Sequence, residues 1–534
     1  MLIRLGQTLR DHSGFRRFTL SLVWGAVAAL ALPPLGLWPV LFLAFPLFLL
    51  MLEGSRTLRS AFSLGWSFGF GYFLVAFHWI GFAFLVDAKT YLWMMPFAVG
   101  GLAAAMAVYW GLAAAITQRL GLQGLRLALG FAALLAIAEW LRGHLFTGFP
   151  WAAPGLAVDG MGAVAQVSSA IGMTGLTLLI VLWAGLGIVI FHKTSWRQRA
   201  AAIALLLLLP AAWAFGLQRL GGARGDSVPG IAIRIVQPNI SQDEKWREDN
   251  ARRIFDTLKQ MSSAPTAARP RGIADVTHVI WPESAVSFLI DESPVAEAEL
   301  RPMLAGRTVL ITGAIRRELP PDGNADQAKV HNSIITFDGN ANPVARYDKW
   351  RLVPGGEFLP FEWLLEPLGF RKVVTVPGSF AAGPGPVTIA IPNAPKAAML
   401  VCYEAIFPND LIGPNDRPGF IVNVTNDGWF GNSTGPYQHL AQTRLRAIEQ
   451  GLPVLRAANT GISAIIDPYG QMTGVLALDS SGVLDGPLPM ALTATVYGRF
   501  GDGALALLAV LALGFAAVGR NATAPLKFAG TSNN

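Results

Sequence analysis

Apolar runs long enough to cross a membrane most limit how this 534-residue chain can fold. Almost everything up to about residue 216 is apolar, and so is a stretch near 503–519. A helix of about 20 apolar residues spans the hydrocarbon core of a bilayer. Charged residues make up 14% of the chain, against about 25% in soluble domains. The sequence therefore predicts a polytopic α-helical membrane protein.

About eight transmembrane helices are expected from these runs. The second candidate is the weakest, because it is short and contains Pro39 and Pro46. The first also resembles a signal peptide, since Arg16 and Arg17 precede its apolar run, but the many spans behind it favour an uncleaved helix. The candidates are residues 18–34, 36–53, 58–84, 92–118, 124–142, 161–191, 198–216 and 503–519.

A segment of ordinary globular composition interrupts the apolar sequence before its last span. We therefore divide the chain into a membrane domain over 1–217 with about seven spans, an inserted domain over 228–498, and a C-terminal span over 503–519. Such an arrangement holds the inserted domain at the membrane surface from both ends.

Lysine and arginine are concentrated in alternate short loops, which predicts the orientation in the membrane. The loops between them are nearly bare: 34–36 has no charge, and Asp87 and Lys89 cancel. We expect cytoplasmic N- and C-termini, and after seven spans an inserted domain on the outer side of the membrane. The net charge of +7 then reflects topology, and no nucleic-acid partner is expected. The loop cations are Arg4, Arg10, Arg16, Arg17, Arg56, Arg59, Arg119, Arg126, Lys193, Arg197 and Arg199.

The inserted domain alternates strand-like and helix-like patterns, which is typical of a layered α/β domain. Helix-like, charged segments lie at about 242–262, 293–304 and 436–451. Strand-like runs cover 231–236, 276–281, 308–314, 333–337, 387–391, 397–403, 420–425, 453–458 and 463–467. In open α/β sheets reactive groups gather at the carboxyl ends of strands.

Three strand ends carry the parts of a nucleophilic acyl-transfer site. Glu283 follows one strand in VIWPES, Lys349 follows another in VARYDKW, and Cys402 ends a third in AAMLVCYE. Cys402 is the only cysteine in the chain, which fits an oxidising compartment because no wrong intramolecular disulfide can form. If the strand continued, Cys402 and Glu404 would point to the same face, since residues two apart in a strand do so.

The chemistry of thioester formation requires these three residue types. A free thiol has a pKa of about 8.5, so little of it is thiolate at neutral pH. A carboxylate can take the thiol proton as general base, the role we expect for Glu283. A lysine ammonium favours the thiolate and stabilises the oxyanion of a tetrahedral intermediate, where one donor contributes about 10²–10³ in rate. Lys349 is expected to be that cation and Cys402 the nucleophile.

The motifs WPES, YDKWRLVPGGEFLP and VCYEAIFP resemble the carbon–nitrogen hydrolase (nitrilase) superfamily with its Glu–Lys–Cys triad. With the membrane spans around them, and with QPNISQDEKW and NVTNDGWFG, the whole chain is similar to the apolipoprotein N-acyltransferase family. This resemblance implies a nitrilase-like α–β–β–α sandwich. It places Glu283, Lys349 and Cys402 on the triad. It also places Glu357, Tyr403 and Glu404 on supporting positions around the site, and Trp246 on an aromatic position near the acyl groups.

The resemblance further implies a multi-pass protein of the bacterial inner membrane with its inserted domain in the periplasm, and a ping-pong reaction. An acyl chain from a phospholipid such as phosphatidylethanolamine would pass to Cys402 as a thioester, and then to the α-amino group of a diacylglyceryl-cysteine at the N-terminus of a lipoprotein. No cofactor and no metal are expected: no cysteine–histidine cluster has zinc spacing, and His439 is interpreted as a packing or capping residue. The G-x-S-x-G pattern at 431–435 is interpreted as chance.

Two other functions remain open on the residues alone. A membrane-anchored nitrilase-type amidase would use the same triad but leave the many spans unexplained. A transporter with a regulatory domain would need ionisable residues inside spans, for which Glu139 and Arg142 are the pair of interest. The stretch 143–160 fits either an ordinary loop or an interfacial segment whose Phe146, Phe149 and Trp151 lie at the membrane surface.

Overall fold

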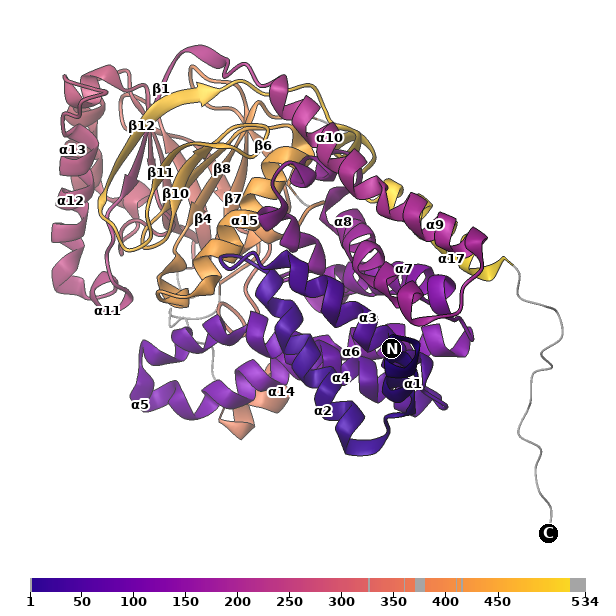
Figure 1. The fold of residues 1–534 in the computed structure, drawn as a ribbon. Helices are drawn as coiled ribbons and strands as arrows, with labels where there is room; N and C mark the ends of the chain where they lie inside the picture. Colours follow the sequence, from indigo (N-terminus) through magenta and orange to yellow (C-terminus); the bar gives the residue numbers. More distant parts are fainter. Residues whose placement is uncertain are drawn as a thin grey trace.

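The computed structural model describes residues 2–324, 327–359, 361–369, 380–409, 411–413 and 416–518. Within them the chain forms a helical part and a part built on two β-sheets, which lie side by side (Figure 1). The helical part is formed by the N-terminal 221 residues together with the helix α17 (Gly503–Ala517). That helix returns to pack against α7 (Gly124–His144) and α8 (Ser168–Gly185). The two-sheet part is therefore anchored to the helices at both of its ends.

The helical part also contains short, tight 3₁₀ segments between and within its longer helices. The principal elements besides those named above are α1 (Leu2–Asp11), α2 (Gly14–Ala28), α3 (Leu41–Glu53), α4 (Leu58–Ala76), η3 (His78–Leu85), α5 (Ala88–Tyr91), α6 (Met95–Arg119), η6 (Pro154–Val167), η7 (Leu186–Phe191), α9 (Trp196–Leu206) and α10 (Leu208–Gly221).

Four helical segments are long and apolar enough to cross a membrane: Ala88–Arg119, Gly124–Thr147, Pro154–Phe191 and Trp196–Gly221. A fifth is possible if the pair α4 and η3, bent by 46°, counts as one span. Trp38–Glu53 and Gly503–Ala517 are apolar but shorter, and α2 has 15 residues. The structure therefore confirms a set of apolar helices but does not confirm eight spans. Several of the expected runs are divided into shorter helices where proline and glycine occur.

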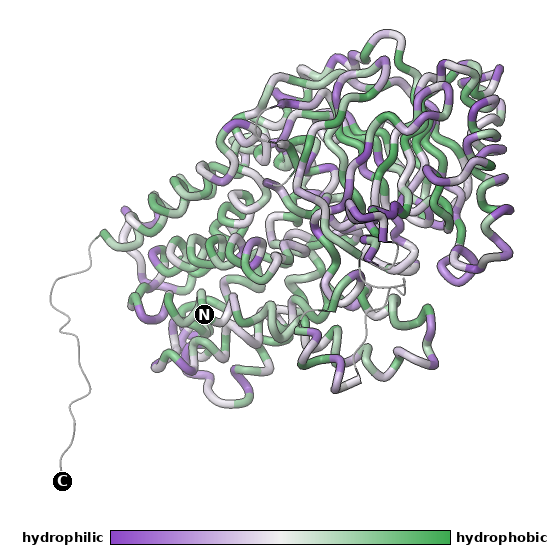
Figure 2. Tube along the Cα trace, turned by 180° about the vertical axis from the view of Figure 1, so that it is seen from behind, coloured by the Kyte–Doolittle hydropathy of each residue, from purple (hydrophilic) through white to green (hydrophobic). Residues whose placement is uncertain are grey.

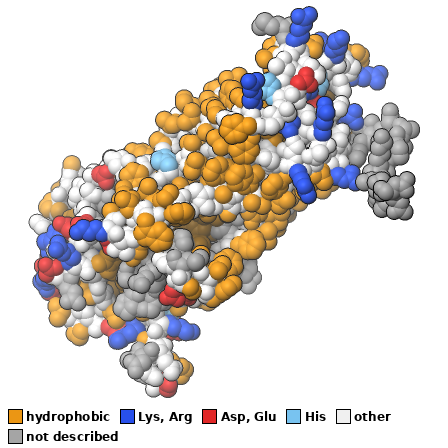
Figure 3. All heavy atoms as spheres, turned by 90° about the horizontal axis from the view of Figure 1, so that it is seen from below, with side chains coloured by type: hydrophobic (Ala, Val, Ile, Leu, Met, Phe, Trp, Pro, Cys, Tyr) orange, Lys and Arg blue, Asp and Glu red, His pale blue; other side chains and the backbone are white. Residues whose placement is uncertain are grey.

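Apolar side chains form a broad zone across the face shown in Figure 3, with Lys and Arg gathered at one end of it and mixed charges at the other. Figure 2 shows the same division along the chain: the helical part is mostly hydrophobic, whereas the helices on the outer face of the sheets are mostly hydrophilic. This distribution is the one expected of a protein that is partly enclosed by lipid.

The two-sheet part has four layers. The first sheet has the strand order β12-β1-β2-β3-β4-β5 and the second the order β11-β10-β9-β8-β7-β6. The helices α12 (Ala251–Ser263) and α13 (Pro294–Leu304) cover the first sheet, and α15 (Thr434–Gln450) covers the second (Figure 1). The strands are β1 (Ser227–Gln237), β2 (His278–Trp281), β3 (Val309–Glu318), β4 (Lys329–Phe337), β5 (Pro343–Asp348), β6 (Thr388–Ile389), β7 (Ala397–Val401), β8 (Phe420–Thr425), β9 (Val454–Ala458), β10 (Ser463–Ile466), β11 (Met472–Leu476) and β12 (Gly482–Pro489).

Successive side chains of a strand point to opposite faces of the sheet, so each strand contributes to two layers of the core. In β2, Ile280 faces the core between the sheets, whereas Val279 and Trp281 face α12 and α13. In β8, Val422 faces the same central core and Ile421 faces α15. The expected α–β–β–α sandwich is therefore the observed arrangement.

The structure differs from the sequence expectation in three places. Strands β11 and β12 do not appear among the expected strands, because their sequences MTGVL and GVLDGPLP alternate weakly and are half exposed. Strand β5 is expected only as the run that precedes Lys349, without bounds. The expected helix 242–262 is divided into α11 (Gln242–Lys245) and α12. Strand β7 ends at Val401, so Cys402 lies one residue beyond it.

Candidate active site

Glu283 lies just after β2, and its position depends on a glycine in the neighbouring strand β3. A Cβ at Gly313 would stand 2.5 Å from the Cα of Glu283, so only glycine lets the turn approach so closely. The Glu283 carboxyl group is 8% exposed and accepts a hydrogen bond from Asn332 Nδ2 at 2.8 Å. Burial, reinforced by Glu357, raises the pKa of Glu283 against the opposing effect of Lys349. Glu283 is therefore placed as a proton acceptor of increased basicity.

Lys349 lies directly after β5, and its buried ammonium is shared by two carboxylates. Its Nζ donates to Glu357 at 2.9 Å and stands 3.9 Å from Glu283 Oε1. Glu357 is fixed in turn by Asn332 Nδ2 at 3.0 Å and by the backbone N–H of Val353 at 2.9 Å. Burial alone would lower the pKa of Lys349, but Glu357 and Glu283 more than offset it and raise the pKa. Lys349 is thus held as a cation.

Cys402 opens a 3₁₀ helix (η13, Cys402–Ile406) with φ of +51°, a conformation uncommon for a residue other than glycine. Its side chain is 7% exposed. Burial and the nearby carboxylates of Glu283 and Asp427 raise the pKa of the thiol, whereas Lys349 lowers it. Glu283, Lys349 and Cys402 come from the ends of three strands and are close enough to shift one another's pKa. The sequence prediction that they lie together is consistent with this geometry.

The expectation that Cys402 and Glu404 share a strand face is wrong, because the chain turns into η13 at Cys402. The Glu404 carboxylate is engaged by neighbouring donors. It accepts hydrogen bonds from the backbone N–H of Val401 at 2.7 Å, that of Trp350 at 2.9 Å, and the hydroxyl of Tyr347 at 2.9 Å. Burial raises the pKa of Glu404 to about 7. Glu404 therefore links the turn formed by Cys402–Ile406, which we call the nucleophile turn because it begins at the predicted nucleophile, to the chain just after Lys349.

Tyr403 connects the nucleophile turn to the helical part. Its hydroxyl donates to the carbonyl oxygen of Gly148 at 3.0 Å, and its ring stacks on Phe149 with centroids 6.2 Å apart. Gly148 has φ of +80°, and a Cβ there would collide with the carbonyl of Gly143. The same loop receives a second hydrogen bond from the two-sheet part, because Arg351 Nη1 donates to Thr147 O at 2.8 Å.

The aromatic residues expected at the membrane surface have different surroundings. Phe146 is 83% exposed, as an interfacial side chain would be. Trp151 is instead buried, where it packs on Trp79 and Phe430 and donates to Gln438 Oε1 at 2.9 Å. Trp151 therefore belongs to the junction between the helices and the sheets, and the interfacial interpretation is wrong for this residue.

A buried network beneath Cys402 was not predicted from the sequence. Asp427 Oδ2 accepts from Arg456 Nη2 at 2.6 Å, and Asp427 Oδ1 lies 2.9 Å from His439 Nδ1. His439 Nε2 faces the carbonyl oxygen of Cys402 at 3.0 Å, so it carries the hydrogen and donates it there. Burial, together with Arg456, lowers the pKa of His439. His439 thus holds the backbone of Cys402, a more specific role than the packing or capping expected from sequence.

Cys402, Asp427 and His439 offer ligand atoms that lie within 4.8 Å of one another, close enough in principle to surround a metal ion. The donor set does not favour one. Arg456 already places a fixed positive charge on Asp427 and stands 3.2 Å from His439 Nδ1. His439 Nε2 is engaged by the Cys402 carbonyl. The expectation that the site needs no metal stays a prediction.

Lys245, in α11, is a second buried ammonium at the site that sequence reasoning missed. It is 2% exposed, and its Nζ donates to the backbone carbonyl of Glu283 at 3.0 Å. Burial lowers the pKa of Lys245 to about 8, although Glu283 and Cys402 act in the opposite direction. Trp246 follows it, is 38% exposed, and lies with its ring centroid 5.8 Å from Lys245 Nζ. The expected aromatic residue therefore stands at the surface beside the site.

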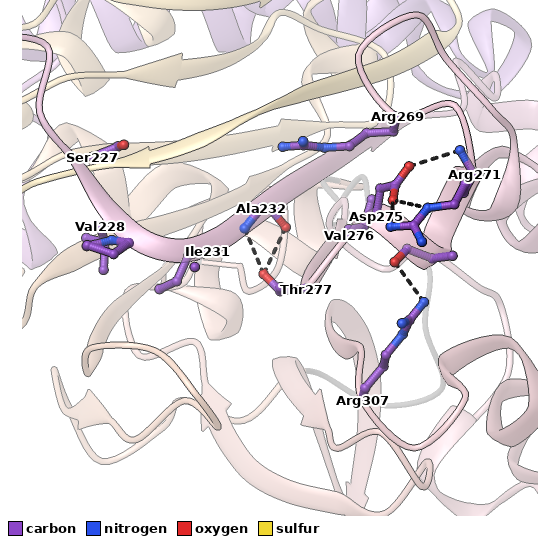
Figure 4. Close-up of a pocket in the computed structure, with 13 residues that line it drawn as sticks. Ser227, Val228, Ile231, Ala232, Arg269, Arg271, Asp275, Val276, Thr277 and Arg307 are labelled. Carbon is purple, nitrogen blue, oxygen red and sulfur yellow. Dashed lines mark hydrogen bonds and ion pairs between the residues drawn. The ribbon is translucent and has the colours of Figure 1, made fainter.

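A groove of about 540 Å³ lies elsewhere, beside the start of β1 (Figure 4). Three arginines line it without converging on a common point. Arg271 is paired with Asp275, Arg307 donates to Ala274 O at 2.7 Å, and Arg269 extends along β1 (Figure 4). The groove contains none of the residues discussed above.

Models of two protein families match the chain. The family described as apolipoprotein N-acyltransferase N-terminal domain matches residues 24–186, and the family described as carbon-nitrogen hydrolase matches residues 232–497. The first match falls on the helical part, and the second falls on the two-sheet part.

Several curated relatives are similar over almost their whole length. An apolipoprotein N-acyltransferase of Rhodopseudomonas palustris is 43% identical over 508 residues, which is 94% of each chain. That of Bradyrhizobium diazoefficiens is 42% identical over 510 residues, again 94% of each chain. That of Brucella melitensis is 40% identical and covers 92% of this chain and 93% of its own. Among solved structures, a mutant amidase of the nitrilase superfamily from Nesterenkonia AN1 matches with 17% identity and a TM-score of 0.33, covering 48% of this chain and 92% of its own.

Proposed function

Because this chain belongs to the apolipoprotein N-acyltransferase family, we propose that Glu283, Lys349 and Cys402 perform its acyl transfer. The protein is a membrane acyltransferase of bacterial lipoprotein biosynthesis, with a carbon–nitrogen hydrolase part that suits a cysteine acyl-enzyme mechanism. The family assignment favours this reaction over the amidase and transporter alternatives. The single observation that carries the assignment of roles is the convergence of a buried base, cation and thiol from three strand ends.

In the first half-reaction, Glu283 takes the thiol proton while Cys402 Sγ attacks the ester carbonyl of a phospholipid. Lys349 Nζ stabilises the oxyanion of the tetrahedral intermediate. The ester C–O bond then breaks, and the departing alkoxide receives the proton from Glu283. The products are a lysophospholipid and a Cys402 thioester. Glu357, which fixes Lys349 at 2.9 Å, keeps the cation in place throughout.

In the second half-reaction, the α-amino group of a diacylglyceryl-lipoprotein attacks the thioester carbonyl. The attacking amine must be neutral, and its reference pKa is about 7.7–8.0, so it gives its ammonium proton to water before it attacks. Glu283 then takes the second proton, which the nitrogen loses as it bonds to the carbonyl carbon. The C–N bond forms, the C–S bond breaks, and the proton passes to the thiolate of Cys402. The site must exclude water, or the thioester would be hydrolysed instead.

The remaining parts of the proposal concern substrates and topology. The acyl donor is a phospholipid of the phosphatidylethanolamine type, and the acceptor is a lipoprotein with a free diacylglyceryl-cysteine. The chain crosses the inner membrane about eight times, with 1–217 and 503–519 in the membrane and 228–498 in the periplasm. Trp246 lies near the acyl chains, and Tyr403 and Glu404 hold the nucleophile turn. Both lipid substrates then meet the site at the height of their headgroups.

Intact-mass measurement tests the acyl-enzyme, because Cys402 is the only cysteine. Purified protein given phospholipid without an amine acceptor should gain one fatty-acyl mass. Neutral hydroxylamine should remove that mass, and a diacylated lipopeptide with a free N-terminus should remove it faster. Cys402→Ser controls for folding and should form no hydroxylamine-sensitive adduct, and neither should Glu283→Gln, which lacks the base. An adduct that decays equally fast without lipopeptide would make the protein a lipid hydrolase.

A further inference from the structure

Gln242 is a buried side chain with an unused amide. It opens the short helix α11, beside Lys245, and is 7% exposed. Among the residues that the structure describes, neither its Nε2 nor its Oε1 has a hydrogen-bond partner. Buried amides in folded proteins nearly always have partners, because an unpaired one loses its hydrogen bonds to water without replacement. An amide left free on both sides indicates a group that is completed by a ligand.

Contacts at both ends of α11 place this amide at the active site. At one end, Lys245 Nζ donates to the carbonyl of Glu283, the proposed base, at 3.0 Å. At the other end, Gln242 lies against the turn that follows β8, where a Cβ at Gly428 would stand 3.0 Å from Gln242 Nε2. Asp427 in that turn has a carboxylate oxygen within 4.8 Å of the Cys402 thiol. The helix α11 therefore extends between the base and the turn next to the nucleophile.

The free amide of Gln242 can both donate and accept hydrogen bonds, unlike the charged side chains of the site. A primary amide has donors on one side and an acceptor on the other, which matches the N–H and C=O that one extended residue of a peptide presents on the same edge. The ester and phosphate groups of a phospholipid present acceptors only. Of the two substrates, the lipoprotein alone has a peptide group next to its reacting amine.

We propose that Gln242 binds the residue that follows the diacylglyceryl-cysteine in the acceptor. Its Oε1 accepts from the peptide N–H of that residue, and its Nε2 donates to the carbonyl oxygen of the same residue, since both groups lie on one edge of an extended residue. The pairing places the α-amine for attack on the thioester and discriminates a lipoprotein from other membrane amines, such as an aminophospholipid headgroup. Gln242 is thus a specificity-determining residue for the second half-reaction. The inference rests on the proposed function.

The variant Gln242→Met tests this role, because methionine keeps the length of the side chain and removes both polar groups. Two acceptors are compared: a diacylated lipopeptide, and the methyl ester of S-diacylglyceryl-cysteine, which lacks the peptide N–H. The wild-type protein should use the lipopeptide with a kcat/KM about tenfold higher, as one well-placed hydrogen bond provides. Gln242→Met should use the two acceptors equally, mainly through a higher KM for the lipopeptide, and should form the acyl-enzyme within about twofold of the wild-type rate.

Gln166→Met is the matched control, since Gln166 is also buried with an unpaired Oε1 but contacts Tyr469 in another part of the molecule. It should keep the preference for lipopeptide. A Gln242→Met enzyme that loses activity on both acceptors in proportion, or that keeps the preference, would overturn the inference. Failure of the wild-type protein to form any acyl-enzyme would instead overturn the proposed function, and it is visible before an acceptor is added.

Discussion

The two sheets contribute to the candidate site in different ways. The first sheet provides charged side chains: Glu283 after β2 and Lys349 after β5, both buried and joined through Asn332 of β4 and the carboxylate of Glu357. The second sheet provides a backbone in an unusual conformation. Cys402 follows β7 with φ of +51°, and His439 of α15 donates to its carbonyl oxygen. In the proposed mechanism, residues of the first sheet accept the proton and stabilise charge. The second sheet fixes the position of Cys402.

This difference has a chemical reason. In the proposed mechanism Glu283 accepts a proton and Lys349 stabilises an oxyanion, so the pKa values of these two side chains matter. The thiol must instead meet a carbonyl carbon at a fixed place. Variants in the first sheet should therefore alter how the rate depends on pH or on charge geometry. Variants around the second sheet should slow the reaction at every pH.

Lys349→Arg, which changes a residue of the first sheet, should slow acyl-enzyme formation more than the other variants considered below. The charge is kept, but a planar guanidinium cannot occupy the place of a compact ammonium that is 1% exposed and bonded to Glu357 at 2.9 Å. We expect acyl-enzyme formation to slow by at least about tenfold, and by up to about 10³ if the oxyanion contact is lost completely. Single-turnover mass measurement gives the rate, and the melting temperature shows whether the variant is folded. A near-normal rate would mean that Lys349 acts only through long-range charge.

His439→Phe should have a smaller effect, on the second sheet's side. Phenylalanine keeps a flat ring but loses the hydrogen bond to Cys402 O, worth about 1 kcal/mol, so acyl-enzyme formation should slow by about fivefold. Burial and Arg456 lower the pKa of His439, and the proposed mechanism gives the ring no part in proton transfer. The pH profile of the rate should therefore keep its shape. A shifted profile would break the comparison, because it would make His439 part of the proton transfer.

Asn332→Leu should produce the smallest effect, limited to low pH. Glu283 must be ionised to accept the thiol proton, and burial raises its pKa, so the rate should fall at a pH above the usual range of a glutamate. The hydrogen bond from Asn332 favours the ionised form and lowers that pKa. Its loss should move the acidic limb of acyl-enzyme formation upward by about one pH unit. At alkaline pH the rate should match wild type, and an unshifted limb would contradict the role given to Asn332.

The sequence indicates the proposed triad because strand ends can be recognised from apolar runs that stop at a polar residue. Glu283 and Cys402 follow such runs, whereas Lys349 follows the weaker pattern PVARYD. Asn332 does not follow a run, since it lies inside β4 and meets Glu283 only through the pairing of β4 with its neighbours. His439 and Gln242 could not be assigned either. The role of His439 depends on how α15 packs under η13. That of Gln242 depends on the lack of a hydrogen-bond partner for its amide among the described residues, which a sequence cannot show.

The membrane part shows a similar limit. Its apolar composition is evident from the sequence, and the pair Glu139 and Arg142 was identified as the charged exception. The structure joins them: Arg142 Nε donates to Glu139 at 2.9 Å, and Trp110 donates to the same oxygen at 2.7 Å. Arg142 also bonds to Phe149 O, in the loop that Tyr403 contacts. The charges therefore have structural partners in the bundle, a feature that hydropathy alone does not reveal.

The bond from Tyr403 to Gly148 has a practical consequence for inhibitor discovery. A truncated, water-soluble fragment of residues 227–489 would contain the whole Glu283, Lys349 and Cys402 set and would be convenient for screening. It would nevertheless lack Gly148 and Phe149, which hold the residue next to the thiol. Compounds selected on such a fragment would bind next to a nucleophile turn that has lost its contacts with the helical part. The full chain in lipid is the target against which compounds should be selected.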